Sequence, residues 1–285
     1  MSSYTYLIQQ VSFYYGIPVL IGGIVGGFLN TIVFLSLQTF RQNSCAFYLL
    51  IMSIVNIGQL FTGLLSRILI SGYNIDWTET SAFYCKFRYF LLQFCTLVSL
   101  TCICLATIDQ YFATSSDPQR RQWNQLKIAH RAVLITILIW FLHGIVYLVF
   151  FTRMYSVGLR RETCLITNSI FTRYHAYGYF LILTGFLPIT IKVLFAILSF
   201  RNIRHTNRLG VPIVRRELDK QLTIMVLVQV AINALTLLPS NIIAAIRTND
   251  SSMSSQLQFA YTICLFIYYF TFVVSSISEF ENKKL

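Results

Sequence analysis

Cys85 and Cys164 are the two residues whose chemistry depends most on where the chain places them. They can form a disulfide only if both reach an oxidising face, where such bonds persist. The other five cysteines lie in or beside apolar stretches and should stay reduced: Cys45, Cys95, Cys102, Cys104 and Cys264. Catalysis within such apolar stretches needs at least two polar residues that act as a pair, whereas Asp109 stands alone. We therefore predict no catalytic residue, no metal site and no cofactor.

Long apolar stretches must position these residues. Hydrophobic residues make up 56% of the 285-residue chain and charged residues only 11%, against about 25% charged in soluble domains. The stretches without charge are 1–40, 42–66, 89–108, 132–152, 221–246 and 251–278, and a seventh, 174–200, is broken only by Lys192. A membrane helix needs about 20 such residues, whereas barrel strands are about 10 long and alternate. The sequence predicts an all-α membrane protein with a seven-transmembrane helix bundle.

The predicted bundle occupies most of the chain. An extracellular N-terminal tail is expected over 1–13, the seven-transmembrane domain over 14–278 and a short cytoplasmic tail over 279–285. The expected helices are 14–38, 45–70, 85–112, 130–151, 174–200, 219–246 and 257–278. Gly22, Gly23, Gly26 and Gly27 form two overlapping Gly-x-x-x-Gly pairs, which allow a neighbouring helix to approach closely.

Basic residues set the predicted orientation. Thirteen Lys and Arg residues fall on the face formed by residues 39–44, 113–131, 201–220 and the C-terminal tail, and seven, Arg88 among them, fall on the other face. Because cytoplasmic loops carry the excess, the N-terminus should lie outside a plasma membrane that the chain crosses several times. The net charge of +12 is explained by anionic lipid at the inner face, without nucleic acid. Cys85 and Cys164 then both face outward, either bridged or as two free thiols.

Further landmarks occur in order along the predicted helices: Asn30, the run Asp109-Gln110-Tyr111 at the end of the third helix, Trp140, Pro188 and Pro239. With the two cysteines, this series resembles the rhodopsin-like (class A) G-protein-coupled receptors. The resemblance implies a Cys85–Cys164 disulfide, helices that pivot at their prolines and a heterotrimeric G protein as partner. Asp109, Gln110 and Tyr111 are then the switch and coupling residues.

The chain also departs from this family. Asn56 stands where the family usually has an aspartate that holds sodium in many members, and Leu237 stands at the usual tryptophan of helix 6. Gln110 replaces an arginine that locks the inactive state, and it cannot form an ion pair. Helix 7 has no Asn-Pro-x-x-Tyr sequence. These differences leave open a receptor-fold protein that does not couple, an atypical or decoy form.

Five residues are candidates for the ligand pocket: Arg67, Leu92, Gln93, Thr96 and Leu237. Leu92 occupies the position of the aspartate in amine receptors, which argues against a biogenic amine. Arg67 either lines a pocket or reaches the outer interface. The outer loops carry more basic than acidic residues, which favours a peptide with carboxylates or a small anion, unless the charge serves only the surface.

Three other residues carry specific expectations. Asp109 is either a latch, with Arg120 or a base of loop 201–218, or a solvated charge. Lys192 is expected to extend to the cytoplasmic face. Asn249 begins an Asn-Asp-Ser glycosylation sequon in the loop between helices 6 and 7.

The leading interpretation is a receptor that transduces an extracellular ligand into cytoplasmic G-protein signalling. A transporter or channel is less favoured, because transporters tend to show internal repeats and charges near the midplane. Here Lys192 is the one charge well inside a predicted helix, and no repeat is visible. An enzyme is not expected.

Overall fold

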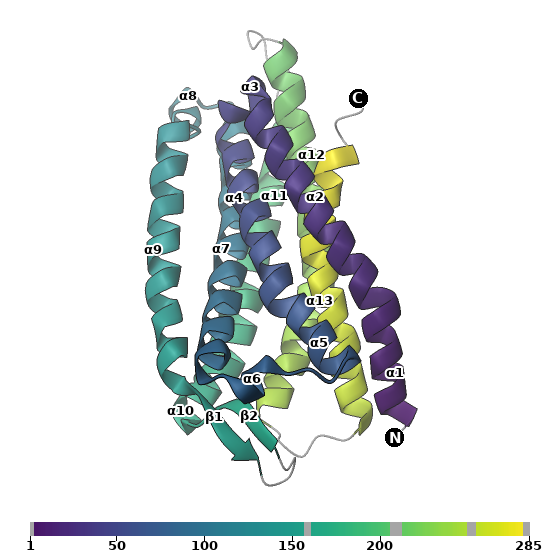
Figure 1. Cartoon of the computed structure of the whole chain (residues 1–285). Helices are drawn as coiled ribbons and strands as arrows, with labels where there is room; N and C mark the ends of the chain where they lie inside the picture. The colour runs from purple at the N-terminus through teal and green to yellow at the C-terminus, as the bar shows by residue number, and fades with distance from the viewer. Residues whose placement is uncertain (1–2, 157–160, 206–212, 250–254, 282–285) are drawn as a thin grey trace.

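The computed structural model describes residues 3–156, 161–205, 213–249 and 255–281. Long helices run along one axis, and a small β-hairpin covers one end (Figure 1). In chain order the elements, with η marking π-helical segments, are α1 (Ser3–Val11), η1 (Ser12–Gly16), α2 (Ile17–Ser36), α3 (Gln38–Arg41), α4 (Ser44–Gln59), η2 (Leu60–Leu65), α5 (Ser66–Gly72), α6 (Trp77–Thr80), α7 (Ala82–Thr114), α8 (Pro118–Arg121), α9 (Leu126–Phe150), β1 (Phe151–Ser156), β2 (Arg161–Ile166), α10 (Ser169–Arg173), η3 (Tyr174–Phe186), α11 (Leu187–His205), α12 (Ile213–Asn249) and α13 (Ser255–Glu281).

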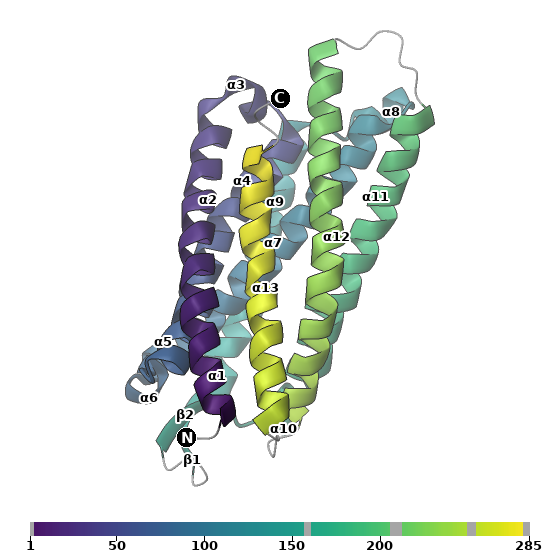
Figure 2. The same cartoon turned by 90° about the vertical axis from the view of Figure 1, so that its right-hand side faces the viewer.

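These elements join into seven rods. Six contain a helical segment long and apolar enough to cross a membrane, and the described apolar part of α13 is Phe259–Phe270. As a whole, α13 has 27 residues, which corresponds to about 40 Å. We name the end with α1, α6 and the β1–β2 hairpin the hairpin end, and the end with α3 and α8 the Asp109 end. The chain starts at the hairpin end, and α13 finishes at the other (Figure 2), as an odd number of crossings requires.

The first rod is longer than the sequence suggests. The expected helix begins at residue 14, whereas the structure continues it back to Ser3. No proline, glycine or charge interrupts residues 3–13, so the backbone can stay helical. Tertiary contacts hold this extension, because Gln9 donates to the carbonyl of Gly72 at 2.9 Å and the Tyr4 ring contacts Phe259.

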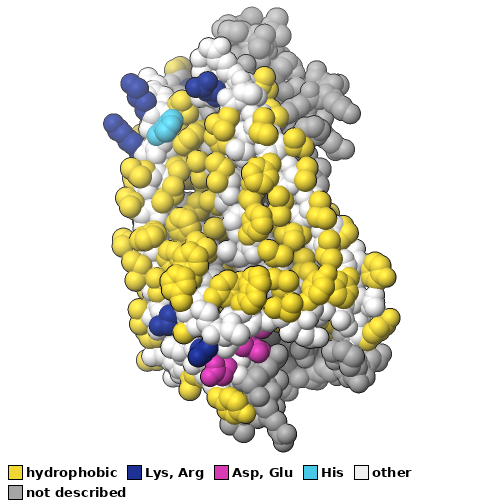
Figure 3. All heavy atoms as spheres, in the orientation of Figure 1, with side chains coloured by type: hydrophobic (Ala, Val, Ile, Leu, Met, Phe, Trp, Pro, Cys, Tyr) yellow, Lys and Arg dark blue, Asp and Glu magenta, His cyan; other side chains and the backbone are white. Residues whose placement is uncertain are grey.

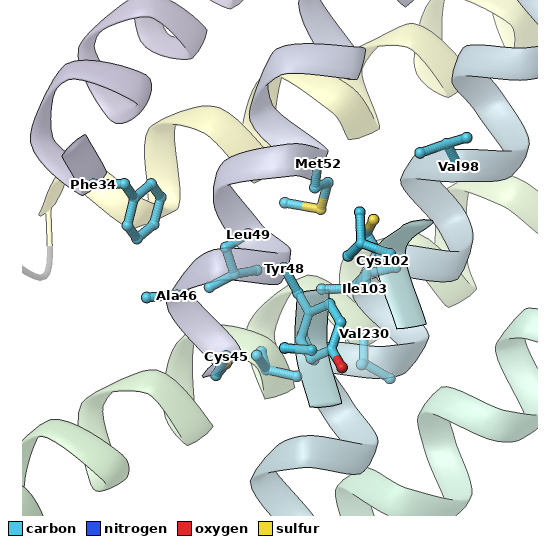
Figure 4. Packing of buried hydrophobic residues seen from close by; sticks show 14 of the residues in the cluster. Phe34, Cys45, Ala46, Tyr48, Leu49, Met52, Val98, Cys102, Ile103 and Val230 are labelled. Atoms are coloured by element: carbon cyan, nitrogen blue, oxygen red, sulfur yellow. The ribbon is translucent and has the colours of Figure 1, made fainter. Parts of the chain in front are cut away.

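The central rod is α7. Of its most apolar stretch, 67% is buried inside the protein, against 22% for α9. The main apolar cluster lies between α4 and α7, where Met52 lies beside Cys102 and Ile103 (Figure 4). Phe34 of α2 and Val230 of α12 complete it. The position of α7 places the Asp109-Gln110-Tyr111 run among the other helices.

A belt of apolar side chains surrounds the bundle. Large hydrophobic residues of α9 are exposed, among them Leu134, Leu138 and Leu142. Figure 3 shows an apolar band along the bundle, with basic side chains near both ends. A soluble protein would not expose such a band, so the chain is a multi-pass membrane protein.

The hairpin end is closed by a disulfide. Cys85, near the start of α7, bonds to Cys164 of β2, as predicted. β1 and β2 pair antiparallel, with Arg153 opposite Cys164. The hairpin was not predicted from the sequence, which indicated only a loop at 152–173. The disulfide therefore fixes a folded hairpin to the central helix.

Close packing explains the glycines of α2. A Cβ atom on Gly23 would lie 2.5 Å from Leu60 and 2.7 Å from Val273, and one on Gly27 would lie 2.7 Å from Ile57. A Cβ on Gly22 would meet nothing within 4 Å. The Gly23–Gly27 pair therefore lets α4, η2 and α13 approach α2.

Candidate functional site

Asp109 joins three parts of the chain at the Asp109 end. The Ser44 hydroxyl donates to both of its carboxylate oxygens, at 2.9 and 2.8 Å. The Asn124 side chain donates to Oδ2 at 3.2 Å. Asp109 is only 6% exposed. Because Ser44 is the first residue of α4, the Asp109 carboxylate also lies at the positive end of the α4 helix dipole. Asp109 is an interhelical contact and not a solvated charge.

Arg120 has other partners than the ones suggested by the sequence. It donates to the Tyr111 hydroxyl at 2.7 Å and lies 3.5 Å from the Asp117 carboxylate. The ring of Tyr111 packs edge-on against Phe195 of α11. Tyr111 thus connects the short loop after α7 to the fifth rod. The sequence also suggested a basic residue of loop 201–218 as a partner of Asp109, but most side chains of this loop lie outside the described part of the chain.

Gln110 connects α7 to α12. The Thr223 hydroxyl donates to Gln110 Oε1 at 2.9 Å, and both side chains are 1% exposed. Gln110 Nε2 has no hydrogen-bond partner. This neutral hydrogen bond joins the two helices at a position where the resemblance would place one partner of an ion pair.

The buried asparagines stabilise the middle of the bundle. Ser99 of α7 donates to Asn56 Oδ1, while Asn56 Nδ2 has no partner. Asn30 is fully buried in α2.

Among the described residues, no group of three or more His, Cys, Asp or Glu side chains could hold a metal ion.

Trp140 also makes an interhelical contact. Its indole N–H donates to the Thr101 hydroxyl of α7 at 2.9 Å. The partly buried ring packs against the main apolar cluster and meets His143 edge-on. Trp140 therefore positions α9 on the central helix.

The two prolines lie at irregular or bent points of their helices. Pro188 follows the 13-residue π-helical segment η3 and starts the regular helix α11. Pro239 lies inside α12 and removes one backbone donor there. Beside it, the Ser240 hydroxyl donates to the carbonyls of Thr236 and Cys264, each at 2.8 Å. The bond to Cys264 links α12 to α13 beside Pro239.

The prediction for Lys192 was wrong. Its side chain is fully buried, and Nζ has no hydrogen-bond partner. It lies on the face of α11 that packs against α7, near Cys104, whose thiol contacts the Pro188 carbonyl. Its full burial places the amine inside the bundle and not at the cytoplasmic interface.

Two arginines point into the bundle near the hairpin end. Arg67 of α5 places its guanidinium 5.8 Å from the ring centre of Tyr261 on α13, inside the bundle. Arg88 of α7 is 8% exposed and donates from Nε to the Thr62 carbonyl at 3.1 Å. From the sequence, Arg88 was counted only as a basic residue of the outer face, although it falls within the predicted helix 85–112. The inward direction of its side chain was not predicted.

The other pocket candidates divide into two groups. Leu92 and Thr96 follow Arg88 at i+4 and i+8, so they share its face of α7. Thr96 is fully buried and lies 3.4 Å from the Tyr268 hydroxyl. Gln93 is 1% exposed, and its Oε1 has no partner. Leu237, fully buried in α12, belongs to a different helix from this group.

At the rim of the hairpin end, one basic residue is already paired. Arg153 forms an ion pair with Glu162 at 2.7 Å and donates to the carbonyls of Glu79 and Thr80. This residue fastens β1 to α6. Asn249 is the last residue of α12, and its side chain and the rest of its sequon lie outside the described part of the chain.

The model of a family described as 7 transmembrane receptor (rhodopsin family) matches residues 29–275, from the last turns of α2 into α13. No curated protein matches the chain.

Proposed function

Because the chain belongs to the rhodopsin family of seven-transmembrane receptors, we propose that it transduces an extracellular ligand into cytoplasmic G-protein signalling. The hairpin end then lies outside the plasma membrane and the Asp109 end in the cytoplasm. Two features support this orientation. Most basic residues cluster beyond the Asp109 end, and the Cys85–Cys164 disulfide requires an oxidising face at the hairpin end.

The Gln110–Thr223 hydrogen bond carries the proposal. It is a weak, neutral contact between α7 and α12 at the cytoplasmic end, and α12 contains Pro239 further out, which removes one backbone donor from the helix. Breaking this contact lets the inner half of α12 move and exposes a cleft for a heterotrimeric G protein. The ligand shifts the equilibrium between the two packings. The excess of basic residues on the outer face favours an acidic ligand, either a peptide with carboxylates or a small anion.

Basal signalling tests the proposal without a known ligand. The chain is expressed with a panel of chimeric G proteins, and the Thr223→Val variant, which removes the hydroxyl, is compared with Thr223→Ser, which keeps it. Loss of one buried hydrogen bond costs the closed state about 1 kcal/mol, which corresponds to a roughly fivefold larger open population. We expect Val, but not Ser, to raise basal signalling at equal surface expression. Unchanged signalling with every G protein would count against coupling.

A second candidate function is a receptor-fold protein without G-protein coupling. The observation that favours it is the neutral Gln110 at the centre of the cytoplasmic end, 1% exposed and without an ion pair. In that case, arrestin recruitment with no G-protein response is expected. The same expression experiment therefore separates the two functions.

A further inference from the structure

We propose that Arg67 and Arg88 together bind a carboxylate group of the extracellular ligand, an inference that rests on the proposed receptor function. The two side chains come from α5 and α7: Arg67 meets Tyr261 of α13, and Arg88 donates to the Thr62 carbonyl of η2. This proposal specifies the acidic ligand of the proposed function further: Arg67 and Arg88 are the binding residues, and a carboxylate is the group that they bind.

Neither arginine has a carboxylate partner among the described residues. These residues contain two ion pairs, Arg120–Asp117 and Arg153–Glu162, and both are at least partly exposed. Arg88 bonds to one backbone carbonyl and lies 5.4 Å from the ring centre of Tyr89. Arg67 Nε is buried without a partner. A guanidinium has several donors and is costly to bury unpaired, and no carboxylate in the described part of the chain pairs with either of these two cations.

Tyr269 lies against the helix turn that separates the two arginines. It is 4% exposed on α13. Its hydroxyl fits against η2 because residue 63 is glycine: a Cβ there would lie 2.5 Å from the Tyr269 oxygen and 2.8 Å from Leu92. Gly63 follows Thr62, whose carbonyl accepts from Arg88, and precedes Arg67 by one helical turn. The Tyr269 hydroxyl and the two arginines therefore belong to the same region between η2–α5, α7 and α13, beside the apolar side chain of Leu92.

At the hairpin end, Arg88 also lines a small pocket with Ser66, Tyr84 and Asp76. The Asp76 carboxylate is occupied, because its Oδ1 accepts bonds from the backbone N–H and the hydroxyl of Thr78 as the cap of α6. A carboxylate suits the two arginines because its two oxygens match the planar donors of a guanidinium.

The test is binding to the purified full chain. The free cysteines Cys45, Cys95, Cys102 and Cys104 are buried, so a thiol-reactive fluorogenic dye reports thermal unfolding. Two pairs of probes distinguish the source of the carboxylate: phenylacetate against phenylacetamide, and a short N-acetylated aromatic peptide with a free acid against its C-terminal amide. We expect at least one acid to raise Tm, and its amide to leave Tm unchanged.

Three variants assign the effect. Arg67→Gln and Arg88→Gln should each raise the half-saturating acid concentration at least tenfold. Arg153→Gln removes the same charge from the rim and should leave it unchanged. If Arg88→Gln does not fold, the half-saturating acid concentration of Arg67→Gln alone decides whether the proposal stands. The proposal is overturned if neither acid stabilises more than its amide, if inorganic phosphate stabilises equally, or if the Gln variants keep the shift.

This assay needs no G protein. Failure of carboxylate binding and failure of G-protein coupling are therefore separate results.

Discussion

Replacing Lys192 with methionine should make the protein more stable. The lysine amine is fully buried and has no hydrogen-bond partner, and Lys192 has no described carboxylate as an ion-pair partner. An unsatisfied buried polar group costs about 1–3 kcal/mol, and an unpaired buried ion costs several. Methionine keeps nearly the same length and volume and removes the amine. The expected gain is therefore at least about 1 kcal/mol.

Thermal unfolding of the purified receptor measures this gain. Lys192→Met should raise Tm above wild type, whereas Lys192→Arg, which keeps a charge in the same place, should not. Since Lys192 lies where α11 meets α7, the added stability should belong mainly to the closed packing and should lower basal signalling. A lower Tm for Lys192→Met would refute the reasoning, because it would mean that the amine has a partner that stabilises the fold.

The remaining predictions concern packing and the disulfide. Cys164→Ser, which opens the bridge to the hairpin, should reduce stability by about 2–4 kcal/mol, measured as a lower Tm and lower surface expression. Trp140→Phe should cost about 1 kcal/mol through the lost indole hydrogen bond, whereas Trp123→Phe, at a 61% exposed position, should have little effect on Tm. Gly27→Leu should cost about 1–3 kcal/mol by overpacking, and Gly22→Leu, where a side chain meets open space, should leave Tm unchanged.

The seven rods and the disulfide could be predicted because they depend on local properties. A charge-free stretch of about 20 residues by itself indicates a membrane-spanning helix. The excess of basic residues indicates which loops lie on the cytoplasmic face. The orientation put Cys85 and Cys164 on one face, and the resemblance to class A receptors implied the bond between them, which the structure contains. The start of the first helix at Ser3 could not be read in this way, because contacts from Gln9 to Gly72 and from Tyr4 to Phe259 hold it.

The candidate sites were only partly predictable, because helix rotation depends on tertiary packing. Arg67 was a candidate with two possible orientations, and its contact with Tyr261 decides for the bundle interior. Arg88 was assigned to the surface and Lys192 to the interface, yet both are buried. Charge alone could not separate these cases, since a long basic side chain can extend along a helix or turn inward according to what its neighbours leave open.

The neutral contact of Gln110 has consequences for how the receptor would switch. An arginine there would gain from an ion pair but lose its hydration in the closed state. Gln110 avoids most of this desolvation cost, and its bond to Thr223 contributes about 1 kcal/mol. Such a bond cannot by itself hold the closed state at more than a few-fold excess. The packing around Asp109, Tyr111 and Lys192 must therefore set the resting equilibrium, so changes at these positions should alter basal signalling more than changes at Thr223.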